Sequence, residues 1–440
     1  MSPESIALIM VACLFAMILA GIPVALAIAG AGLVFGYIGF GETLFSLLPA
    51  RVFGVITNYT LLAIPLFVFM GVLLEKSRLA EDTLSALGHL AGNRPGGMAL
   101  AIVLVGVLMG ASTGIVGATV VTMGLITLGK LLERGYRSSL ACGTICASGT
   151  LGQIIPPSLV LILLSDIMGE SVGALFAAAV MPSLLLAALY AVYIIAIGRF
   201  LPHWAPPVPQ AERDALSRRQ LLLRVLKSAV PPLALIAVVL GSIISGLAAP
   251  TEAAAMGALG ALLITVLGRK MNGRVLGETV RDTLKITGMI MFVLIAAQIF
   301  ALSFRGLDGE YLIEGVFDML PGGMWGALIF TMAAIFILGF FLEWIEISYI
   351  VLPLMLPVFI AMDVDMIWFA MLVTLNLQAS FLTPPFGWAL FFLKGVAPPQ
   401  VATREIYAGA LPFIGIQLLG LTLVMAFPAI ATWLPGTLGW

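Results

Sequence analysis

The sequence predicts an all-α polytopic membrane protein built as an inverted repeat, with two re-entrant helical hairpins and two broken transmembrane helices. Three observations predict this fold class: an apolar composition, two apolar segments interrupted by Pro-Pro pairs, and loop charges that segregate by side. Of the 440 residues, 61% are hydrophobic and only 10% are charged. A soluble domain carries about 25% charged residues, so the composition predicts a chain that lies mostly within a bilayer.

The first interrupted segment spans residues 140–164 and contains the sequence SGTLGQIIPPS at 148–158. A proline provides no N–H for the carbonyl four residues before it. The proline pair at 156–157 is therefore expected to free the carbonyls of Gly152 and Gln153. In hydrocarbon an unpaired carbonyl costs several kcal/mol, so a broken helix persists only where protein, water or an ion satisfies it.

A second segment, residues 368–393, repeats this pattern with the sequence LTPPFG at 382–387. Its proline pair is expected to free the carbonyls of Ser380 and Phe381. A lone membrane proline is usually a simple kink, but two Pro-Pro pairs at corresponding places favour a binding site. The sequence therefore predicts a transporter, with its site where broken helices and hairpins meet near the bilayer midplane.

The other apolar segments give the order of the predicted spans. Residues 98–128 have basic residues at both ends, so they are predicted to enter and leave the membrane on one side as a hairpin. Residues 325–360, bounded by Asp318 and Asp363, form the second predicted hairpin. Residues 275–285 are amphipathic and are predicted to lie as an arm along the membrane surface. The predicted full spans are 5–20, 24–40, 60–74, 140–164, 172–197, 229–247, 253–267, 287–303, 368–393 and 409–430.

Charge supports this topology. With the N-terminus outside, all but two of the 21 lysines and arginines fall on the inner side, the exceptions being Arg51 and Arg305. Of the 22 acidic residues, 11 fall outside and 9 inside, while Glu343 and Glu346 lie within the second hairpin. The positive-inside rule describes such a segregation. The first hairpin then opens inward and the second outward, and both termini are predicted to be periplasmic.

Two hairpin features each have a functional and a structural interpretation. The small residues GASTG at 110–114 either form an ion-coordinating tip through Ser112 and Thr113 or allow close helix packing. Glu343 and Glu346 are three residues apart and share one helical face. Either one of them is a cation ligand or proton carrier, or both cap a half-helix of the hairpin. The sequence leaves this second alternative open.

Enzyme and nucleotide-binding classes find little support. The sequence from Gly124 to Lys130 has the spacing of a phosphate-binding loop, but Leu131 stands where a Ser or Thr would hold magnesium. Cys142 and Cys146 have no histidine partners nearby in the sequence and are interpreted as buried apolar residues. No nucleophile–base pair is recognisable, so we predict a non-enzyme driven by an ion gradient.

Three motifs, in this order, resemble the large membrane subunit of tripartite ATP-independent periplasmic (TRAP) transporters. They are GASTGIVGAT at 110–119, GTLGQIIPPS at 149–158 and LTPPFG at 382–387, and the resemblance covers the whole chain. It implies an elevator-type, sodium-driven permease of the bacterial inner membrane. It also implies two partners, a small four-span membrane subunit and a periplasmic substrate-binding protein, and a carboxylate-bearing cargo.

The resemblance further implies two sodium sites, with Na⁺ as the coupling ion and no organic cofactor. Many members have a short Asp-Thr hairpin sequence where this chain has EWIE at 343–346, which is a departure from the family pattern at the second site. The implied ligands are Ser112, Thr113, Gly152, Ile155 and Pro157 for site one, and Glu343, Trp344, Ser380, Phe381 and Pro384 for site two.

Neither predicted core contains a lysine or arginine to bind the carboxylate. Helix N-termini, hydroxyls and amides are therefore expected to do so. A standalone sodium- or proton-coupled carboxylate symporter without a binding protein is the alternative function. The predicted substrate-binding residues are Ser112, Thr113, Gln153, Ser158, Asn376, Gln378 and Thr383.

The predicted organisation has four regions. Residues 1–95 hold N-terminal spans and interfacial helices for the scaffold and the small-subunit contact, and 96–199 hold the first repeat core with its inward-opening hairpin. Residues 200–323 hold a cytoplasmic loop, scaffold spans and the amphipathic arm, and 324–440 hold the second repeat core with its outward-opening hairpin.

Overall fold

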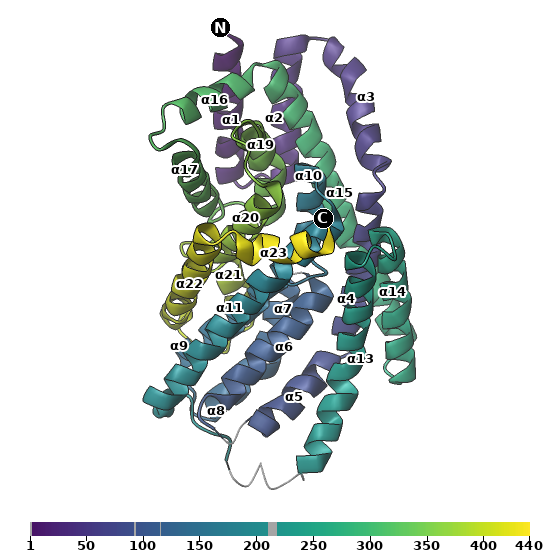
Figure 1. Ribbon diagram of the computed structural model, residues 1–440, viewed down its shortest axis with the longest axis vertical. Helices are drawn as coiled ribbons and strands as arrows, with labels where there is room; N and C mark the ends of the chain where they lie inside the picture. Colours follow the sequence, from purple (N-terminus) through teal and green to yellow (C-terminus); the bar gives the residue numbers. More distant parts are fainter. Residues whose placement is uncertain (1, 92–93, 115, 210–217) are drawn as a thin grey trace.

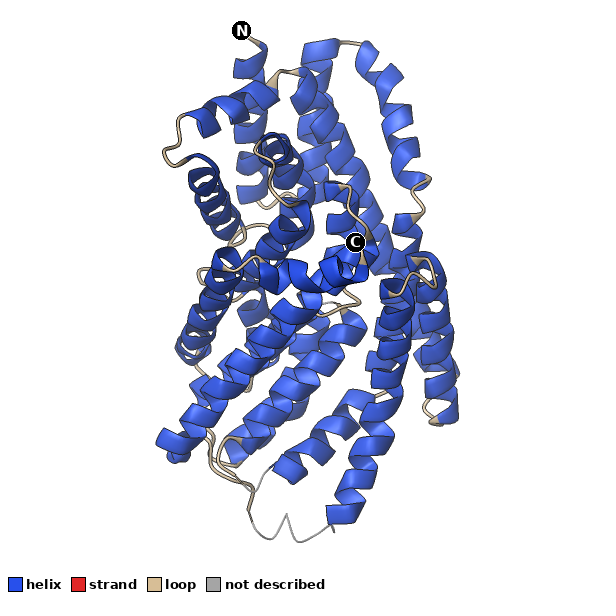
Figure 2. Ribbon diagram, viewed as in Figure 1, coloured by secondary structure: helices blue, strands red, loops and turns tan. Residues whose placement is uncertain are grey.

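The computed structural model describes residues 2–91, 94–114, 116–209 and 218–440. Within these ranges the chain consists of helices joined by short loops and contains no strand (Figure 2). Seven helices are long and apolar enough to cross a membrane, or up to nine if each of two bent helix pairs counts as one span. These helices agree with the prediction of an all-α, polytopic membrane protein.

The helices of residues 3–56 lie at one end of the molecule, and those of residues 79–91 and 97–113 lie toward the other end (Figure 1). Glycines mark the ends of α6, because Gly96 (φ +82°) precedes it and Gly114 (φ +61°) follows it in left-handed conformations that suit glycine. The helices are α1 (Pro3–Leu19), α2 (Val24–Phe40), α3 (Thr43–Ile56), α4 (Ala63–Lys76), α5 (Leu79–Ala91), α6 (Gly97–Thr113), α7 (Val116–Met123), α8 (Gly129–Glu133), α9 (Ser138–Thr150), α10 (Leu159–Met168) and α11 (Val172–Phe200).

The second half contains a similar order of elements. Gly322 (φ +94°) precedes α17 as Gly96 precedes α6, and the Asp365 side chain caps α20 by accepting the Trp368 N–H at 2.9 Å. The helices are α13 (Arg218–Ile244), α14 (Pro250–Leu267), α15 (Gly273–Gly306), α16 (Gly309–Asp318), α17 (Gly323–Leu338), α18 (Trp344–Glu346), α19 (Leu352–Ala361), α20 (Met366–Phe381), α21 (Trp388–Val396), α22 (Thr403–Ala426) and α23 (Ala429–Leu438).

Helix α15 corrects the prediction of a separate amphipathic arm. Residues 275–285 and 287–303 belong to one helix of 34 residues, which starts where the Asn272 side chain accepts the Val275 N–H at 2.8 Å. No proline interrupts it, and its isolated glycines do not break the hydrogen-bond ladder. The sequence change from amphipathic to apolar therefore marks a change of surroundings along one continuous helix.

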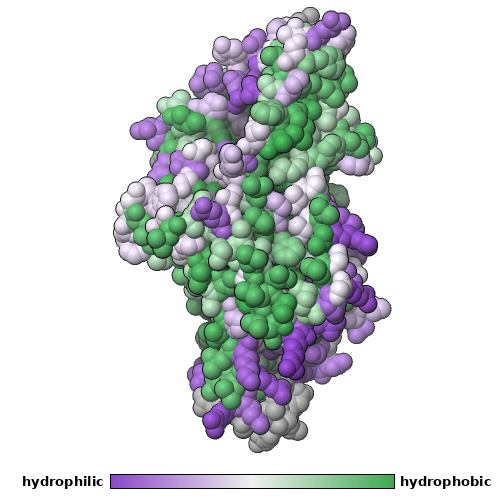
Figure 3. All heavy atoms as spheres, turned by 90° about the vertical axis from the view of Figure 1, so that its right-hand side faces the viewer, coloured by the Kyte–Doolittle hydropathy of each residue, from purple (hydrophilic) through white to green (hydrophobic). Residues whose placement is uncertain are grey.

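The outer surface is strongly hydrophobic. Figure 3 shows a face on which hydrophobic side chains cover much of the surface, with hydrophilic groups gathered toward its two ends. Large apolar side chains point outward from helices near this face, among them Phe53 on α3 and Leu263 on α14. Such extensive exposed apolar surface is typical of a chain embedded in lipid.

Helices α9 and α20 lie in the interior. Every side chain from Leu140 to Thr150 in α9, and from Trp368 to Phe381 in α20, is buried. Helix α9 packs against α6 and α22, and α20 packs against α17, α11 and α22. These two polar-containing helices are thus surrounded by other helices, which removes them from direct contact with lipid.

Candidate functional site

Two segments interrupt the buried helices. We call residues 151–158, between α9 and α10, break one, and residues 382–387, between α20 and α21, break two. We also call α6 to α8 (97–133) hairpin one and α17 to α19 (323–361) hairpin two. The Pro-Pro peptide bond in each break is cis. The breaks predicted from the proline pairs are therefore present in the structure.

Hairpin one contacts break one through glycines. A Cβ atom on Gly110 would lie 2.6 Å from the Cα of Gly152, and one on Gly106 would lie 2.6 Å from the Cβ of Ser148. Real Cβ atoms essentially never come this close, so the two backbones touch only because these positions lack side chains. Gly114, at the turn of the hairpin, lies against the first residue of α10, Leu159.

Hairpin two contacts the end of α20, directly before break two, and also break two itself. A Cβ atom on Gly339 would lie 2.5 Å from the Cβ of Ser380. The rings of Phe341 and Phe386 lie 5.8 Å apart, which joins the turn of the hairpin to the break itself. Gly110 and Gly339 therefore make comparable contacts, because Gly152 and Ser380 each lie four positions before the first proline of a pair.

The backbone of break one frees fewer carbonyls than the prolines alone suggest. The Ile155 N–H donates to the Leu151 carbonyl at 3.1 Å, so neither it nor Pro156 provides a helical donor to Gly152. The Gln153 carbonyl, however, accepts the Ser158 hydroxyl at 2.5 Å. The expectation for Gln153 is thus corrected, because a nearby side chain replaces the missing N–H.

At break two, too, fewer carbonyls are free than the prolines alone suggest. The Ser380 carbonyl accepts the Thr383 N–H at 3.0 Å, which corrects the expectation that this carbonyl is free. The residues three and four positions after Phe381 would normally donate a helical N–H to its carbonyl. Both are prolines and have no N–H. The carbonyls of Gly152 in break one and of Phe381 at the end of α20 therefore both lack a helical donor.

The predicted substrate-binding residues are brought to the two breaks, but most make internal hydrogen bonds. The Asn376 amide donates to the Met332 carbonyl in α17 at 2.6 Å, and the Thr383 hydroxyl donates to the Ala379 carbonyl at 2.8 Å. Gln153 differs, because both polar atoms of its buried amide have no hydrogen-bond partner. Of the described residues in this set, Gln153 is thus the one most available to a ligand.

Ser112 and Thr113 end helix α6, but their side chains lie outside the part of the chain that the structure describes. Their role at the tip of hairpin one stays a prediction. Ile155 and Pro157 lie in break one beside Gly152, and Pro384 lies in break two.

The two acids of hairpin two have different surroundings. The buried Glu346 carboxylate accepts the backbone N–H of Glu343 at 2.8 Å and so caps the short helix α18. Trp344 begins that helix, and its carbonyl accepts the Ser348 hydroxyl at 2.7 Å. The structure thus favours a capping role for Glu346, while the Glu343 side chain stays the candidate ion ligand.

Substitutions distinguish these roles. If uptake is sodium-driven, as the resemblance implies, Glu343→Gln should change its sodium dependence, because the substitution removes the charge and keeps the backbone N–H that Glu346 accepts. Glu346→Gln retains an oxygen acceptor and should leave the sodium dependence unchanged, whereas Glu346→Ala should lower stability by about 1 kcal/mol. Sodium titrations of uptake and thermal melting measure the two effects. Unchanged sodium dependence in Glu343→Gln would make both acids structural.

The two halves interlock beyond these contacts. Helix α21, after break two, packs on α7 of hairpin one, and Gly117 and Gly124 allow Phe392 and Leu393 to approach closely. Helix α10, after break one, contacts α18 and α19 of hairpin two. Asp166 in α10 accepts hydrogen bonds from Asn58 at 2.5 Å and Tyr349 at 3.3 Å. Each hairpin therefore contacts parts of both broken helices.

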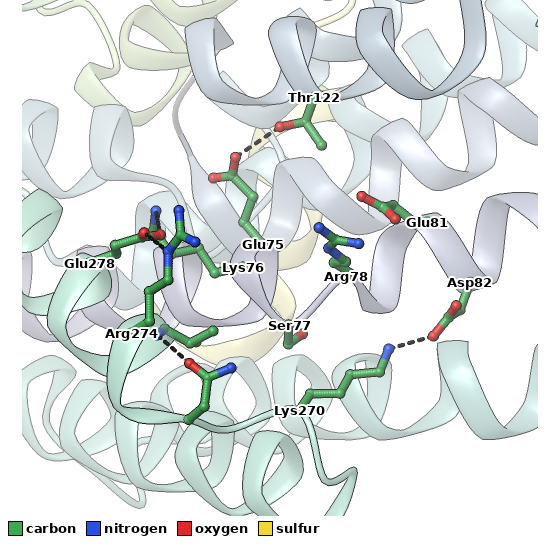
Figure 4. A pocket seen from close by; sticks show the side chains of 12 residues that line it. Glu75, Lys76, Ser77, Arg78, Glu81, Asp82, Thr122, Lys270, Arg274 and Glu278 are labelled. Atoms are coloured by element: carbon green, nitrogen blue, oxygen red, sulfur yellow. Dashed lines mark hydrogen bonds and ion pairs between the residues drawn. The ribbon is translucent and has the colours of Figure 1, made fainter.

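A polar cavity of about 750 Å³ lies away from the breaks, between α4, α5, α7 and the start of α15 (Figure 4). The ion pairs among its lining residues include Lys270 with Asp82, and Lys76 with Glu278 at 3.4 Å. The Thr122 hydroxyl on hairpin one donates to the Glu75 carboxylate on α4 at 2.9 Å. Hairpin one is thus held to α4 by a polar contact at this cavity.

The sequence interpretation missed three buried polar residues. Thr150, Tyr190 and Gln417 come together from α9, α11 and α22, and Gln378 joins them. Gln417 stands alone in an apolar span, and an isolated polar residue in a span is a functional signal. That signal was available, but its partners could not be identified without the structure.

Comparisons with known proteins agree on one family. The family model described as "Tripartite ATP-independent periplasmic transporter, DctM component" matches residues 11–430. A C4-dicarboxylate TRAP transporter large permease from Vibrio cholerae is 30% identical over 95% of both chains. An ectoine TRAP transporter large permease from Halomonas elongata is 29% identical over 97% of this chain and 98% of its own.

A solved structure supports the fold. The YdaH transporter of Alcanivorax borkumensis is 14% identical, with a TM-score of 0.59, over 94% of this chain and 97% of that one. At this identity the likeness concerns the fold alone.

Proposed function

Because this chain belongs to the DctM component family of tripartite ATP-independent periplasmic transporters, we propose that it is the permease subunit of a secondary active transporter that imports a carboxylate-bearing solute with sodium. The observation that carries the proposal is the pairing of each hairpin with a broken helix, through Gly110 against Gly152 and Gly339 against Ser380. Paired interrupted helices are how many secondary transporters build ion and substrate sites.

The first proposed ion site lies where hairpin one meets break one. It uses Ser112 and Thr113 of the hairpin tip with the backbone at Gly152, Ile155 and Pro157. The Gly152 carbonyl, which lacks a helical donor, is a neutral oxygen of the kind that sodium accepts. A sodium ion bound there would give the Gly152 carbonyl a partner, which costs less free energy than burying that carbonyl unpaired.

The second proposed ion site lies where hairpin two meets break two. Glu343 and Trp344 belong to the hairpin, while Ser380, Phe381 and Pro384 belong to the broken helix. The carbonyl of Phe381 corresponds to the orphan carbonyl of break one. A carboxylate at Glu343 would make this site more strongly attractive to a cation than the first.

The cargo is proposed to bind between the two ion sites. Gln153 provides an unpartnered amide, and helices α10 and α21 begin directly after the breaks, so their positive ends would favour an anion. The names of curated relatives include C4-dicarboxylate and sialic acid transport. A carboxylate is the group that these recognition elements suit.

Transport is proposed to follow an elevator movement in the inner membrane. The moving body would contain both hairpins, both broken helices and α11 and α22, which pack on one another. Helix α15 packs along α2 and α4, and α14 packs on α4, so these helices would form the static scaffold. The contact between Thr122 and Glu75 would then break and re-form as hairpin one moves.

Partners follow from the family. Its name describes a three-part periplasmic transporter, and curated relatives are named large permeases. We propose that a small membrane subunit with four spans binds the scaffold, that a periplasmic binding protein delivers the solute, and that both termini of this chain face the periplasm.

Reconstitution tests the proposed function. The large and small subunits in liposomes should take up labelled carboxylate only when the binding protein is outside and a sodium gradient points inward. Potassium in place of sodium is the control for coupling. Rapid uptake of free solute without the binding protein would contradict the proposal and favour a standalone symporter.

A further inference from the structure

A second cavity lies where α5, α6 and α11 meet, toward the end of the molecule opposite α1 (Figure 1). Its volume is about 800 Å³. Pockets that bind small molecules commonly measure roughly 300–1,000 Å³. The cavity shares no lining residue with the polar cavity beside α4, and none of the residues of the two proposed ion sites lines it. It is therefore a separate feature of the molecule.

Two arginines supply the charge of this cavity, which we call the arginine cavity. Arg94 lies in the loop before α6, and Arg199 is the last residue but one of α11. The other described residues that line the cavity are apolar or glycine, among them Leu90, Leu100 and Ile195, and none is acidic. Neither arginine belongs to the ion pairs found among the described residues. The arginine cavity thus combines two positive charges with an apolar wall.

A glycine contact brings the two arginines to one cavity. A Cβ atom on Gly198 would collide with the carbonyl oxygen of Pro95, so the loop before α6 touches α11 only because Gly198 has no side chain. The Arg94 carbonyl accepts the Gly97 N–H at 3.0 Å, which fixes the turn that carries Arg94. Arg94 and Arg199 each stand directly beside the contact in the sequence. Both therefore line the same cavity.

Exposed apolar side chains lead away from the cavity along both helices. On α11, residues exposed at spacings of three or four lie on one face of the helix. They are Leu184, Ala188, Val192, Ile195 and Arg199. On α6, Leu104 is 50% exposed and lies one turn after Leu100 of the cavity wall. Because such apolar surface is typical of contact with lipid, Arg199 stands at the end of a lipid-facing stripe.

The position of the arginines suits a phospholipid headgroup. Both lie on the side of the membrane that the charge segregation predicts to be cytoplasmic. Basic pockets between transmembrane helices on that side bind anionic headgroups. A guanidinium group binds phosphate oxygens through paired N–H donors and is weakly hydrated, so it can meet a phosphate at the edge of the membrane.

We propose that the arginine cavity binds one anionic phospholipid. Its phosphate would lie between Arg94 and Arg199, and an acyl chain would follow the apolar stripes of α6 and α11. A free phosphate ion would use the arginines and leave the apolar wall without a partner. A lipid without net charge would use the wall and leave the positive charge uncompensated. The two features together select a lipid whose headgroup is negative, and this proposal depends on neither the sodium sites nor the cargo.

Native mass spectrometry of the purified full-length protein tests the proposal, with phosphatidylglycerol or phosphatidylcholine of the same chain length as the added lipid. The first phosphatidylglycerol should bind at least about fivefold more tightly than phosphatidylcholine, since one basic residue beside an anionic headgroup contributes about this factor. Glycerol 3-phosphate at the same concentration should not displace it, because it has no acyl chain. Equal binding of the two lipids, or displacement by glycerol 3-phosphate, would overturn the proposal.

Substitutions show whether the lipid occupies this cavity. Arg94→Gln and Arg199→Gln should each weaken binding of the first phosphatidylglycerol about fivefold and leave phosphatidylcholine binding unchanged. Both arginines are exposed, so melting temperatures should stay normal. Arg404→Gln is the matched control, because Arg404 is exposed on the same predicted side, near the start of α22, and does not line the cavity.

Two results would contradict a phosphate held between the arginines. An equal loss of affinity in all three variants would mean that the lipid responds only to the overall surface charge. Wild-type affinity in either Arg94→Gln or Arg199→Gln would place the lipid elsewhere on the protein. Either result would overturn the proposal, whether or not the protein transports a carboxylate with sodium.

Discussion

Replacing Gly110 with alanine should abolish sodium-dependent uptake while the protein still reaches the membrane. The new methyl group would lie 2.6 Å from the Cα and 2.7 Å from the N of Gly152, both of them backbone atoms. Backbone cannot turn aside as a flexible side chain can, so hairpin one and break one must separate. Overpacking of this kind costs typically about 1–3 kcal/mol, and here the cost falls on the proposed ligand geometry.

Gly339→Ala should have a similar effect at the second proposed ion site, where the added methyl group would meet Ser380. Gly129→Ala in hairpin one is the matched control, because no atom lies within 4 Å of its added Cβ. That change should leave uptake intact and favour the helix by up to about 1 kcal/mol. The measurements are uptake in liposomes and sodium-dependent thermal shift. Normal uptake by Gly110→Ala would show that the contact with Gly152 does not form the ion site.

The interrupted architecture could be predicted from the sequence because its causes are local. A proline removes a backbone hydrogen bond wherever it stands, but a pair alone does not break a helix, since Pro231 and Pro232 lie inside the continuous helix α13. The breaks were predictable because the pairs at 156–157 and 384–385 also stand beside glycine and polar residues at corresponding places. The predicted breaks are therefore present between α9 and α10 and between α20 and α21, while the re-entrant course of the hairpins stays a prediction. Apolar runs bounded by charged residues indicated where helices run, and the composition indicated that they lie in a membrane.

Other features depend on contacts that local patterns do not encode. Helix α15 is continuous although its sequence changes from amphipathic to apolar near residue 286. Such a change alters the surroundings of the side chains but does not interrupt the backbone hydrogen bonds. The Ser158 hydroxyl reaches back five residues to the Gln153 carbonyl, and this depends on the exact fold of the break. Thr150 and Gln417 are 267 positions apart, so their hydrogen bond follows only from how the two halves pack.

The double substitution of Pro156 and Pro157 by alanine should strongly reduce sodium-dependent uptake without harming folding. The two new N–H groups can donate to the carbonyls of Gly152 and Gln153, so the helix would continue through break one. Alanine is favoured over proline in a helix by about 3 kcal/mol per residue, so the change is energetically downhill for the backbone. A straightened helix would withdraw the Gly152 carbonyl from the ion and displace Ser158 from the Gln153 carbonyl.

The chain offers a matched control in Pro231 and Pro232, another Pro-Pro pair, which lies inside the continuous helix α13. Replacing that pair by alanine makes the same chemical change where no break exists, so sodium affinity should stay normal. Calorimetry on the purified proteins should then find sodium binding weakened at least roughly tenfold, or about 1.4 kcal/mol, in the break-one variant alone. Wild-type sodium affinity in both variants would mean that the prolines at 156–157 only bend the helix, and the coupling ion would have to bind elsewhere.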